Sequence, residues 1–305
     1  MSLISLIVAL LIEQIHPLAQ RRQISIAIAR YANFLERHLN AGEHKHGVIA
    51  WLIAVLPVVI GAAVVYWLLN RVHPLLGWAW NVVVLYLTMG FRQFSHYFTD
   101  IHQALRQGDI AAARALLAAW RGQSADTCDA NDIASLAIEE GIVAAHHHVF
   151  AVVVWFVLLP GPSGALLYRL ALHFSRRWGG IEGAGPFSEF PRRAFAVLDW
   201  LPARLTAAAF AVVGDFEDAV YCWRTQAAQW PDRNLGVVLA SGAGALGVRL
   251  GMPIAQGSEI IDRPELGVGD MADAAFMESA VGLGWRALVM WLVLLFLLGF
   301  ATLVG

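Results

Sequence analysis

The stretch Val48–Leu69, VIAWLIAVLPVVIGAAVVYWLL, decides the class of fold, because it carries no charged side chain over the length of a membrane crossing. A transmembrane helix needs about 20 predominantly apolar residues. Hydrophobic residues make up 58% of the whole chain and charged residues 14%, whereas roughly 25% of a typical soluble domain is charged. The sequence therefore predicts an all-α, polytopic membrane protein.

Further apolar runs lie on both sides of this stretch. They are Leu3–Ile12, Leu75–Met89, Ile142–Leu159, Ala196–Val213 and Ala287–Val304. The first run has no basic segment before it and no small-residue cleavage site after it. We therefore expect it to be a retained helix and not a signal peptide.

The basic residues indicate the topology, because cytoplasmic loops carry an excess of lysine and arginine. Separate crossings by Ile142–Leu159 and Ala196–Val213 would place the arginines between them outside. We therefore predict about four transmembrane helices, with these two runs as re-entrant or interfacial helices at the inner leaflet. An arrangement with six spans is the alternative. The residues behind this prediction are Arg21, Arg22, Arg30, Arg37, Lys45, Arg92, Arg106, Arg114, Arg121, Arg169, Arg176, Arg177, Arg192 and Arg193.

This topology predicts a single integral membrane domain over residues 1–305, located in the bacterial inner membrane. Residues 91–141 are expected to form a cytoplasmic helical loop, with Gly108-Asp109 as a helix stop and N-cap. Residues 214–286 are expected to form a cytoplasmic, glycine-rich loop region. Membrane lipid is the expected partner, and a net charge of −2 gives no reason to expect nucleic acid.

The glycine-dense block Ala240–Pro253 (ASGAGALGVRLGMP), followed by Ile261–Asp270 (IDRPELGVGD), is the candidate functional region. Each glycine costs conformational entropy on folding, so a cluster suggests close approach of a ligand or of another backbone. Arginine supplies bidentate contacts to anions. We predict a ligand site made of Ser241, Gly242, Gly244, Arg249, Asp262, Arg263 and Asp270. The small residues could equally line a contact in a homo-oligomer.

Other polar groups have structural as well as functional interpretations. Arg92, His96 and Asp100 recur at helical spacing and predict a polar stripe at the membrane interface, either a solvated face or a pocket lining. The three histidines His146–His148 cannot all bind one ion from a regular helix, because successive residues point about 100° apart. Glu139 and His146 share a face and are the metal candidates, although we expect no metal and a polar helix end instead.

The block Ala240–Gly251, with Ile261–Pro264 and Gly269-Asp270, resembles the carboxy-terminal signature of the CobD/CbiB cobalamin-biosynthesis membrane proteins. The resemblance extends to Gly108-Asp109, to Ala165–Arg169 and to the segment Leu201–Leu205 (LPARL). The segment Val197–Gly214 is similar to AmpE, a membrane protein of the same superfamily associated with β-lactamase regulation.

The resemblance implies an ATP-dependent, amide-forming ligase of the adenosylcobinamide-phosphate synthase type, with Mg-ATP and a corrinoid as reactants. Glu140 matches the first acid of the family's E-x-x-x-E-N-x-x-D-G run and is the catalytic candidate. Ala144, Ala145, His148 and Val149 replace the other residues of that run. Two hypotheses follow: a member of the cobalamin branch that keeps the carboxy-terminal site, or a non-catalytic, AmpE-like membrane sensor or regulatory partner protein.

Overall fold

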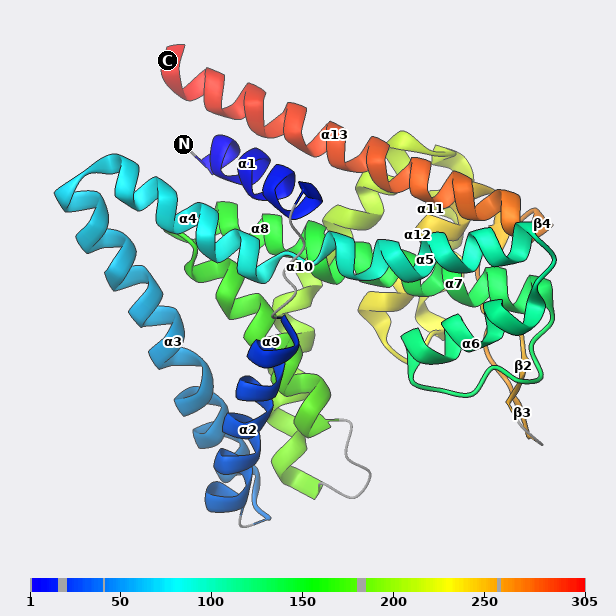
Figure 1. The fold of residues 1–305 in the computed structure, drawn as a ribbon, viewed down its shortest axis with the longest axis horizontal. Coiled ribbons are helices and arrows are strands. Elements are labelled where there is room, and N and C mark those ends of the chain that lie inside the picture. The colour runs from blue at the N-terminus through cyan, green and yellow to red at the C-terminus, as the bar shows by residue number, and fades with distance from the viewer. Residues whose placement is uncertain (1, 16–20, 41, 180–184, 257–258, 305) are drawn as a thin grey trace. The chain divides into compact units, whose positions relative to one another are not determined.

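The computed structural model describes residues 2–15, 21–40, 42–179, 185–256 and 259–304 (Figure 1). Within these ranges the regular structure is almost entirely helical, and each strand has only two or three residues. The predicted all-α class is confirmed. The chain forms two compact units, Met1–Gly90 with Ala151–Pro202 and Phe91–Phe150 with Ala203–Gly305. Both units draw on distant parts of the sequence, and the predicted single domain stays a prediction.

Unit 1 is a set of packed helices. It contains α1 (Ser2–Ile15), α2 (Arg21–Leu39), α3 (His44–Val72), α4 (Pro74–Thr88), α8 (Ala151–Leu158), α9 (Ser163–Gly179), the 3-10 turn η2 (Gly185–Ser188) and the first part of α10 (Glu189–Val213). A tight corner joins α3 to α4, because His73 is extended and its Nδ1 accepts the N–H of Leu75 at 3.2 Å. Pro74 then starts α4, a position that proline favours.

Aromatic side chains fill the core of unit 1 where α9 meets η2. The rings of Phe174 and Trp178 lie 4.5 Å apart, and those of Trp178 and Phe187 lie 5.5 Å apart. All three side chains are buried. Gly47 of α3 lies directly against the backbone carbonyl of Phe187, where a Cβ atom would overlap it. The beginning of α3 is thereby packed against the segment that follows α9.

Unit 2 is built around α7. It contains α5 (Phe91–Arg106), α6 (Ile110–Arg121), α7 (Ala130–Ala145), the π-helical η1 (His146–Phe150), the rest of α10, α11 (Phe216–Thr225), η3 (Ala227–Gln229), α12 (Arg233–Leu246), β1 (Val248–Arg249), β2 (Ile254–Gln256), β3 (Glu259–Ile261), β4 (Asp270–Met271) and α13 (Ala274–Val304). Every residue from Ile133 to Glu139 is buried, because α5, α6, α12 and α13 all pack on α7. The predicted cap at Asp109 is confirmed, since its Oδ1 accepts the N–H of Ala112 at 2.9 Å.

Within the described residues, four helices are long and apolar enough to cross a membrane: His44–Val72, Ala130–Leu158, Gly185–Val213 and Ala274–Ala301. The number agrees with the prediction, but two of the four contain the runs Ile142–Leu159 and Ala196–Val213 that we expected to be re-entrant. The remaining apolar helices, α1 and α4, have 14 and 15 residues. The difference arises because the two long helices continue through polar residues that precede each apolar run.

The region 214–286 also differs from the expected loop, because α11, α12 and the beginning of α13 lie within it. The glycine-rich residues Ala240–Ala245 are helical and buried in α12. A Cβ atom at Gly244 would overlap the backbone carbonyl of Asp218 in α11. Glycine at this position therefore allows two helices to pack backbone to backbone.

Replacing Gly244 with alanine should lower the free energy of unfolding by about 1–3 kcal/mol, because the added methyl group overpacks a closed helix contact. The matched control is Gly282→Ala in α13, where no atom lies within 4 Å of the position that the added methyl group would take. That change should be neutral or stabilise the helix by up to about 1 kcal/mol. Thermal unfolding in detergent, followed by tryptophan fluorescence, measures both; equal midpoints would contradict the packing role.

Candidate functional site

Glu139, on the central helix of unit 2, is a buried carboxylate. Its Oε1 accepts the backbone N–H of Gly251 at 2.9 Å, and its Oε2 forms an ion pair with Nη2 of Arg263. These partners lie 112 and 124 residues further along the chain. A buried charge is costly unless it is paired and hydrogen-bonded. Glu139 therefore anchors the segment between α12 and α13 to the core of unit 2.

Backbone pairing gives this segment its shape. The strands β1 and β4 pair in parallel, with Val248 opposite Asp270. Leu250 and Leu266 exchange two backbone hydrogen bonds of 2.7 and 2.9 Å, and both side chains are fully buried. The antiparallel pair of β2 and β3 lies between Leu250 and Leu266 along the chain. The segment is thus a folded β-loop and not an open glycine-rich chain.

The side chain of Gln226, which lies between α11 and η3, forms two hydrogen bonds with the same loop. Its Oε1 accepts the N–H of Gly267 at 2.6 Å, and its Nε2 donates to the carbonyl of Gly267 at 3.0 Å. Gly251 and Gly267 have φ of 75° and 91°, a left-handed conformation that favours glycine. A Cβ atom would also overlap a backbone carbonyl at each position. The backbone conformation of the loop therefore requires glycine at both positions.

The two arginines of the loop have different environments. The guanidinium of Arg263 lies 5.2 Å from the ring centroid of Trp230, in addition to its pairing with Glu139. Its Nη1 is buried and has no hydrogen-bond partner among the described residues. Arg249 pairs with Glu265 at 3.7 Å, and these side chains are 38% and 49% exposed. An exposed pair contributes little stability, so Arg249 is the arginine that can change partner at low cost.

The predicted ligand residues fall into two groups. Ser241, Gly242 and Gly244 are buried in α12; the hydroxyl of Ser241 donates to the carbonyl of Ala207 at 2.8 Å, and Gly242 lies against Ile142 and Phe210. Arg249, Asp262 and Asp270 are at least partly exposed on the loop, and Arg263 is partly buried. The structure therefore groups the second set and assigns the first to helix packing. Their roles in ligand binding and in a homo-oligomer stay predictions.

The catalytic candidate Glu140 lies apart from the loop contact, because its Oε1 pairs with Nε of Arg121 at 3.3 Å. Neighbouring residues of a helix point about 100° apart, so only one of the two glutamates faces the loop. Glu139 shares the helical face of Ser135 and Ile142, and both of those residues are buried.

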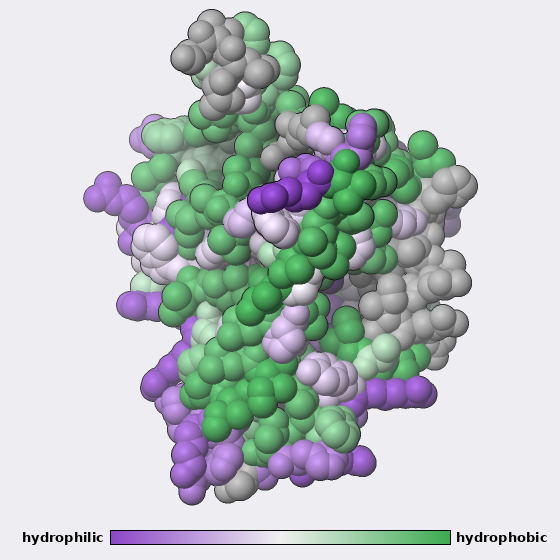
Figure 2. Space-filling view, turned by 90° about the vertical axis from the view of Figure 1, so that its left-hand side faces the viewer, coloured by the Kyte–Doolittle hydropathy of each residue, from purple (hydrophilic) through white to green (hydrophobic). Residues whose placement is uncertain are grey.

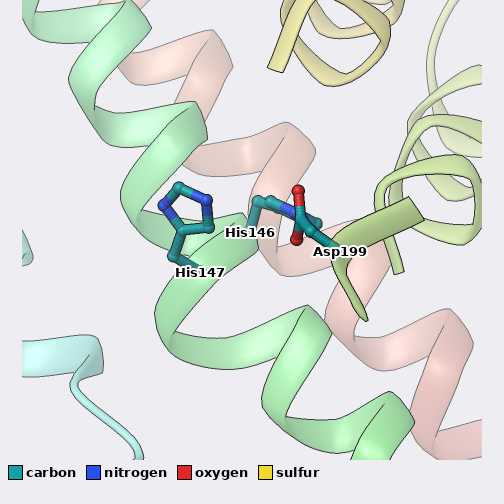
Figure 3. A group of neighbouring side chains, drawn as sticks. All are labelled: His146, His147 and Asp199. Atoms are coloured by element: carbon teal, nitrogen blue, oxygen red, sulfur yellow. The ribbon is translucent and has the colours of Figure 1, made fainter. Parts of the chain in front are cut away.

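His146, the other metal candidate (Figure 3), is buried. Its Nδ1 lies 2.9 Å from the hydroxyl oxygen of Thr206, within hydrogen-bonding distance. It begins a π-helical turn, whereas the spacing argument assumed a regular α-helix. Figure 3 also labels Asp199 of α10. Within unit 1, this carboxylate accepts a hydrogen bond of 2.6 Å from the hydroxyl of Tyr168, and both side chains are buried. The expected polar helix end is wrong, because His146 is buried and lies inside the continuous helix Ala130–Leu158; the expected absence of a metal stays a prediction.

The predicted polar stripe and the two cysteines lie outside the loop. His96 and Asp100 are exposed on α5, and the side chain of Arg92 lies outside the described residues. Both cysteines are free and buried. Burial, with Asp218 nearby, raises the pKa of Cys222 to about 11. The thiol of Cys222 is therefore protonated at neutral pH and is a poor nucleophile.

Replacing Glu139 with alanine should lower the free energy of unfolding by about 3–5 kcal/mol, because Arg263 is left as an unpaired buried charge. Glu140→Ala is the matched control, and its partly exposed ion pair should contribute less than about 1 kcal/mol. The double variant Glu139→Leu/Arg263→Met should recover most of the loss, because an apolar pair replaces the buried charges. Denaturant unfolding in detergent measures all three, and equal losses for Glu139→Ala and Glu140→Ala would refute the anchoring role.

The chain was compared with known proteins. It is 36% identical to the cobalamin biosynthesis protein CobD of Stutzerimonas stutzeri, over 96% of each chain. It is 35% identical to CobD of Chromobacterium violaceum, over 75% of this chain and 73% of the relative. It is 26% identical to the cobalamin biosynthesis protein CbiB of Salmonella typhimurium, over 72% and 71%. No solved structure matches. The family described as CobD/Cbib protein matches residues 6–283, and the chain therefore belongs to the CobD/CbiB family.

Proposed function

We propose that this protein acts in cobalamin biosynthesis as a multi-pass protein of the bacterial inner membrane that binds a corrinoid. Within that pathway we propose that it binds the corrinoid of the adenosylcobinamide-phosphate synthase step without itself catalysing the synthesis. The observation that carries the proposal is the similarity to the cobalamin biosynthesis protein CobD of Stutzerimonas stutzeri over 96% of both chains. The anchored loop of unit 2 supplies the candidate binding surface.

The pairing of the two arginines supports separate roles for them. Arg263 is held by a buried carboxylate, and breaking that pair is costly. Arg249 has only a long, exposed contact with Glu265. A phosphate or carboxylate of the ligand can displace such a contact and form bidentate hydrogen bonds with the guanidinium. We therefore assign direct ligand contact to Arg249 and positioning of the loop to Arg263.

The two glutamates at the loop are not free to hold the magnesium that ATP-driven amide synthesis requires, which leaves the exposed Asp262 and Asp270 as the loop's other carboxylates. Magnesium is held against phosphates by one or two free carboxylates, whereas Glu139 and Glu265 are paired with arginines at the loop. Among the described side chains of unit 2, no three acidic, histidine or cysteine residues converge as an ion site. We derive no step that uses Mg-ATP, and the proposal is for a corrinoid-binding member of the family.

A non-catalytic, AmpE-like sensor or regulatory partner protein is the second candidate. The observation that favours it is the internal neutralisation of both arginines of the loop by glutamates of the same chain. The two candidates differ in one property, because only the first requires the protein to bind a corrinoid. If the protein also synthesised the amide, the addition of Mg-ATP would convert the bound corrinoid.

The purified protein, in detergent, should be titrated with adenosylcobyric acid and with cobinamide while the corrinoid absorbance is followed, with and without Mg-ATP. We expect saturable binding that does not require Mg-ATP. Arg249→Ala should weaken it at least about tenfold, which corresponds to the loss of one charge-assisted hydrogen bond.

Arg106→Ala is the matched control, because Arg106 also forms an exposed ion pair in unit 2, at 3.0 Å from Glu278, but lies outside the loop. The affinity of the Arg106→Ala variant for the corrinoid should equal that of the unmodified protein. If no binding is detected at about 1 mM ligand, any remaining affinity is too weak to be specific. This result would rule out the corrinoid proposal and favour the second candidate. Conversion of the corrinoid with Mg-ATP would contradict the binding-only assignment.

A further inference from the structure

Unit 1 contains a polar cavity of about 430 Å³ that the proposed function does not use. Asn33, Glu36 and Arg37 of α2, and Asn40 directly after it, line it together with Arg177 of α9. Glu36, Arg37 and Asn40 lie three, four and seven positions after Asn33, a spacing that places them on one face of a helix. Two helices that are distant in sequence thus direct amides and guanidinium groups toward the same space.

The chemistry of the lining favours an anion with several oxygen atoms. Arg177 donates to Oδ1 of Asn33 from Nη2 at 2.7 Å and from Nε at 3.2 Å, which orients its planar guanidinium. Arg37 adds a second guanidinium, and Glu36 is the single acid. The lining therefore has a net positive charge. Guanidinium groups bind phosphate through bidentate, charge-assisted hydrogen bonds.

The position of the cavity along the chain indicates that the phosphate belongs to a lipid. Asn40 lies only four residues before His44, where α3 begins, and α3 is one of the four helices apolar enough to span a membrane. Figure 2 shows apolar surface over much of the face that includes α3 and hydrophilic groups along its lower edge, the end at which α2 lies in Figure 1. The cavity is therefore adjacent to the entry of α3 into the membrane, where lipid phosphates lie.

The surface of α2 supports the same location. Its exposed residues include Ile26, Tyr31 and Phe34, with Phe34 56% exposed, alongside Arg30 and Arg37. Exposed apolar and basic side chains on one helix are typical of helices that lie in the membrane interface. The hydroxyl of Tyr31 donates to the carbonyl of Ile53 in α3 at 3.3 Å, which ties α2 to the membrane-spanning helix.

We propose that this cavity binds the phosphate of an anionic phospholipid, with Arg37 and Arg177 contacting the phosphate oxygens. Arg177 is held in place by Asn33, and Asn40 supplies a further donor at the end of α2. The net positive charge of the lining selects anionic over zwitterionic headgroups, as basic groups do at the cytoplasmic leaflet. The site is independent of the loop in unit 2 and of the corrinoid.

Native mass spectrometry of the full chain in detergent tests the proposal, with phosphatidylglycerol, phosphatidylcholine or inorganic phosphate added. We expect one phosphatidylglycerol molecule to be retained in preference to phosphatidylcholine. Arg37→Gln/Arg177→Gln should weaken its retention at least about tenfold, which corresponds to the loss of charge-assisted contacts. Arg30→Gln/Arg193→Gln is the matched control, because it removes the same charge from exposed arginines of unit 1 outside the cavity.

Three results would overturn the proposal. Equal loss in the control would show a general charge effect, equal retention of phosphatidylcholine would exclude selection by charge, and binding of inorganic phosphate without lipid would identify a soluble ligand. If the double variant does not fold, Asn40→Ala replaces it, since Asn40 is exposed at the end of α2. Unchanged retention in that variant and in Arg37→Gln alone would also refute the site.

Discussion

Glu139 is a buried acidic side chain on the central helix of unit 2, and the arrangement of the carboxy-terminal half depends on how its carboxyl group is satisfied. The free-energy cost of burying a carboxylate is offset only where donors surround it. Here the donors are a backbone N–H of Gly251 and the guanidinium of Arg263. Both come from the loop between β1 and β4, so the burial of Glu139 depends on the packing of this loop against α7. The backbone hydrogen bonds between Leu250 and Leu266 then close the loop, and both leucine side chains are buried.

The glycines of the block have structural roles that differ between its two parts. In the amino-terminal part of the block they remove side-chain volume, as at Gly244, so that α12 can approach α11. In the loop they permit the positive φ of Gly251 and Gly267. Neither role requires a ligand. Among the predicted ligand residues, Arg249, Asp262 and Asp270 are the ones whose side chains the loop leaves at least partly exposed.

Much of the helical framework could be predicted from local patterns. The Gly108-Asp109 stop and the apolar runs identified helices that the structure contains, because capping and hydropathy depend on neighbouring residues. The extent of the helices that precede Ile142 and Ala196 could not be predicted in the same way. Polar residues such as Glu139 interrupt the apolar pattern, yet they are satisfied by tertiary partners and the helix continues through them.

The sequence by itself determined the membrane-protein class, because long apolar runs can satisfy their backbone polar groups in lipid only as helices. It also determined the resemblance to the CobD/CbiB family, since that depends on the order and spacing of residues. Only the tertiary structure decided which of two adjacent glutamates receives the loop and which of two arginines is left with a weak partner. Those choices depend on contacts between residues 112 and 124 positions apart. They follow from the burial of one helical face against the rest of unit 2, which no local pattern specifies.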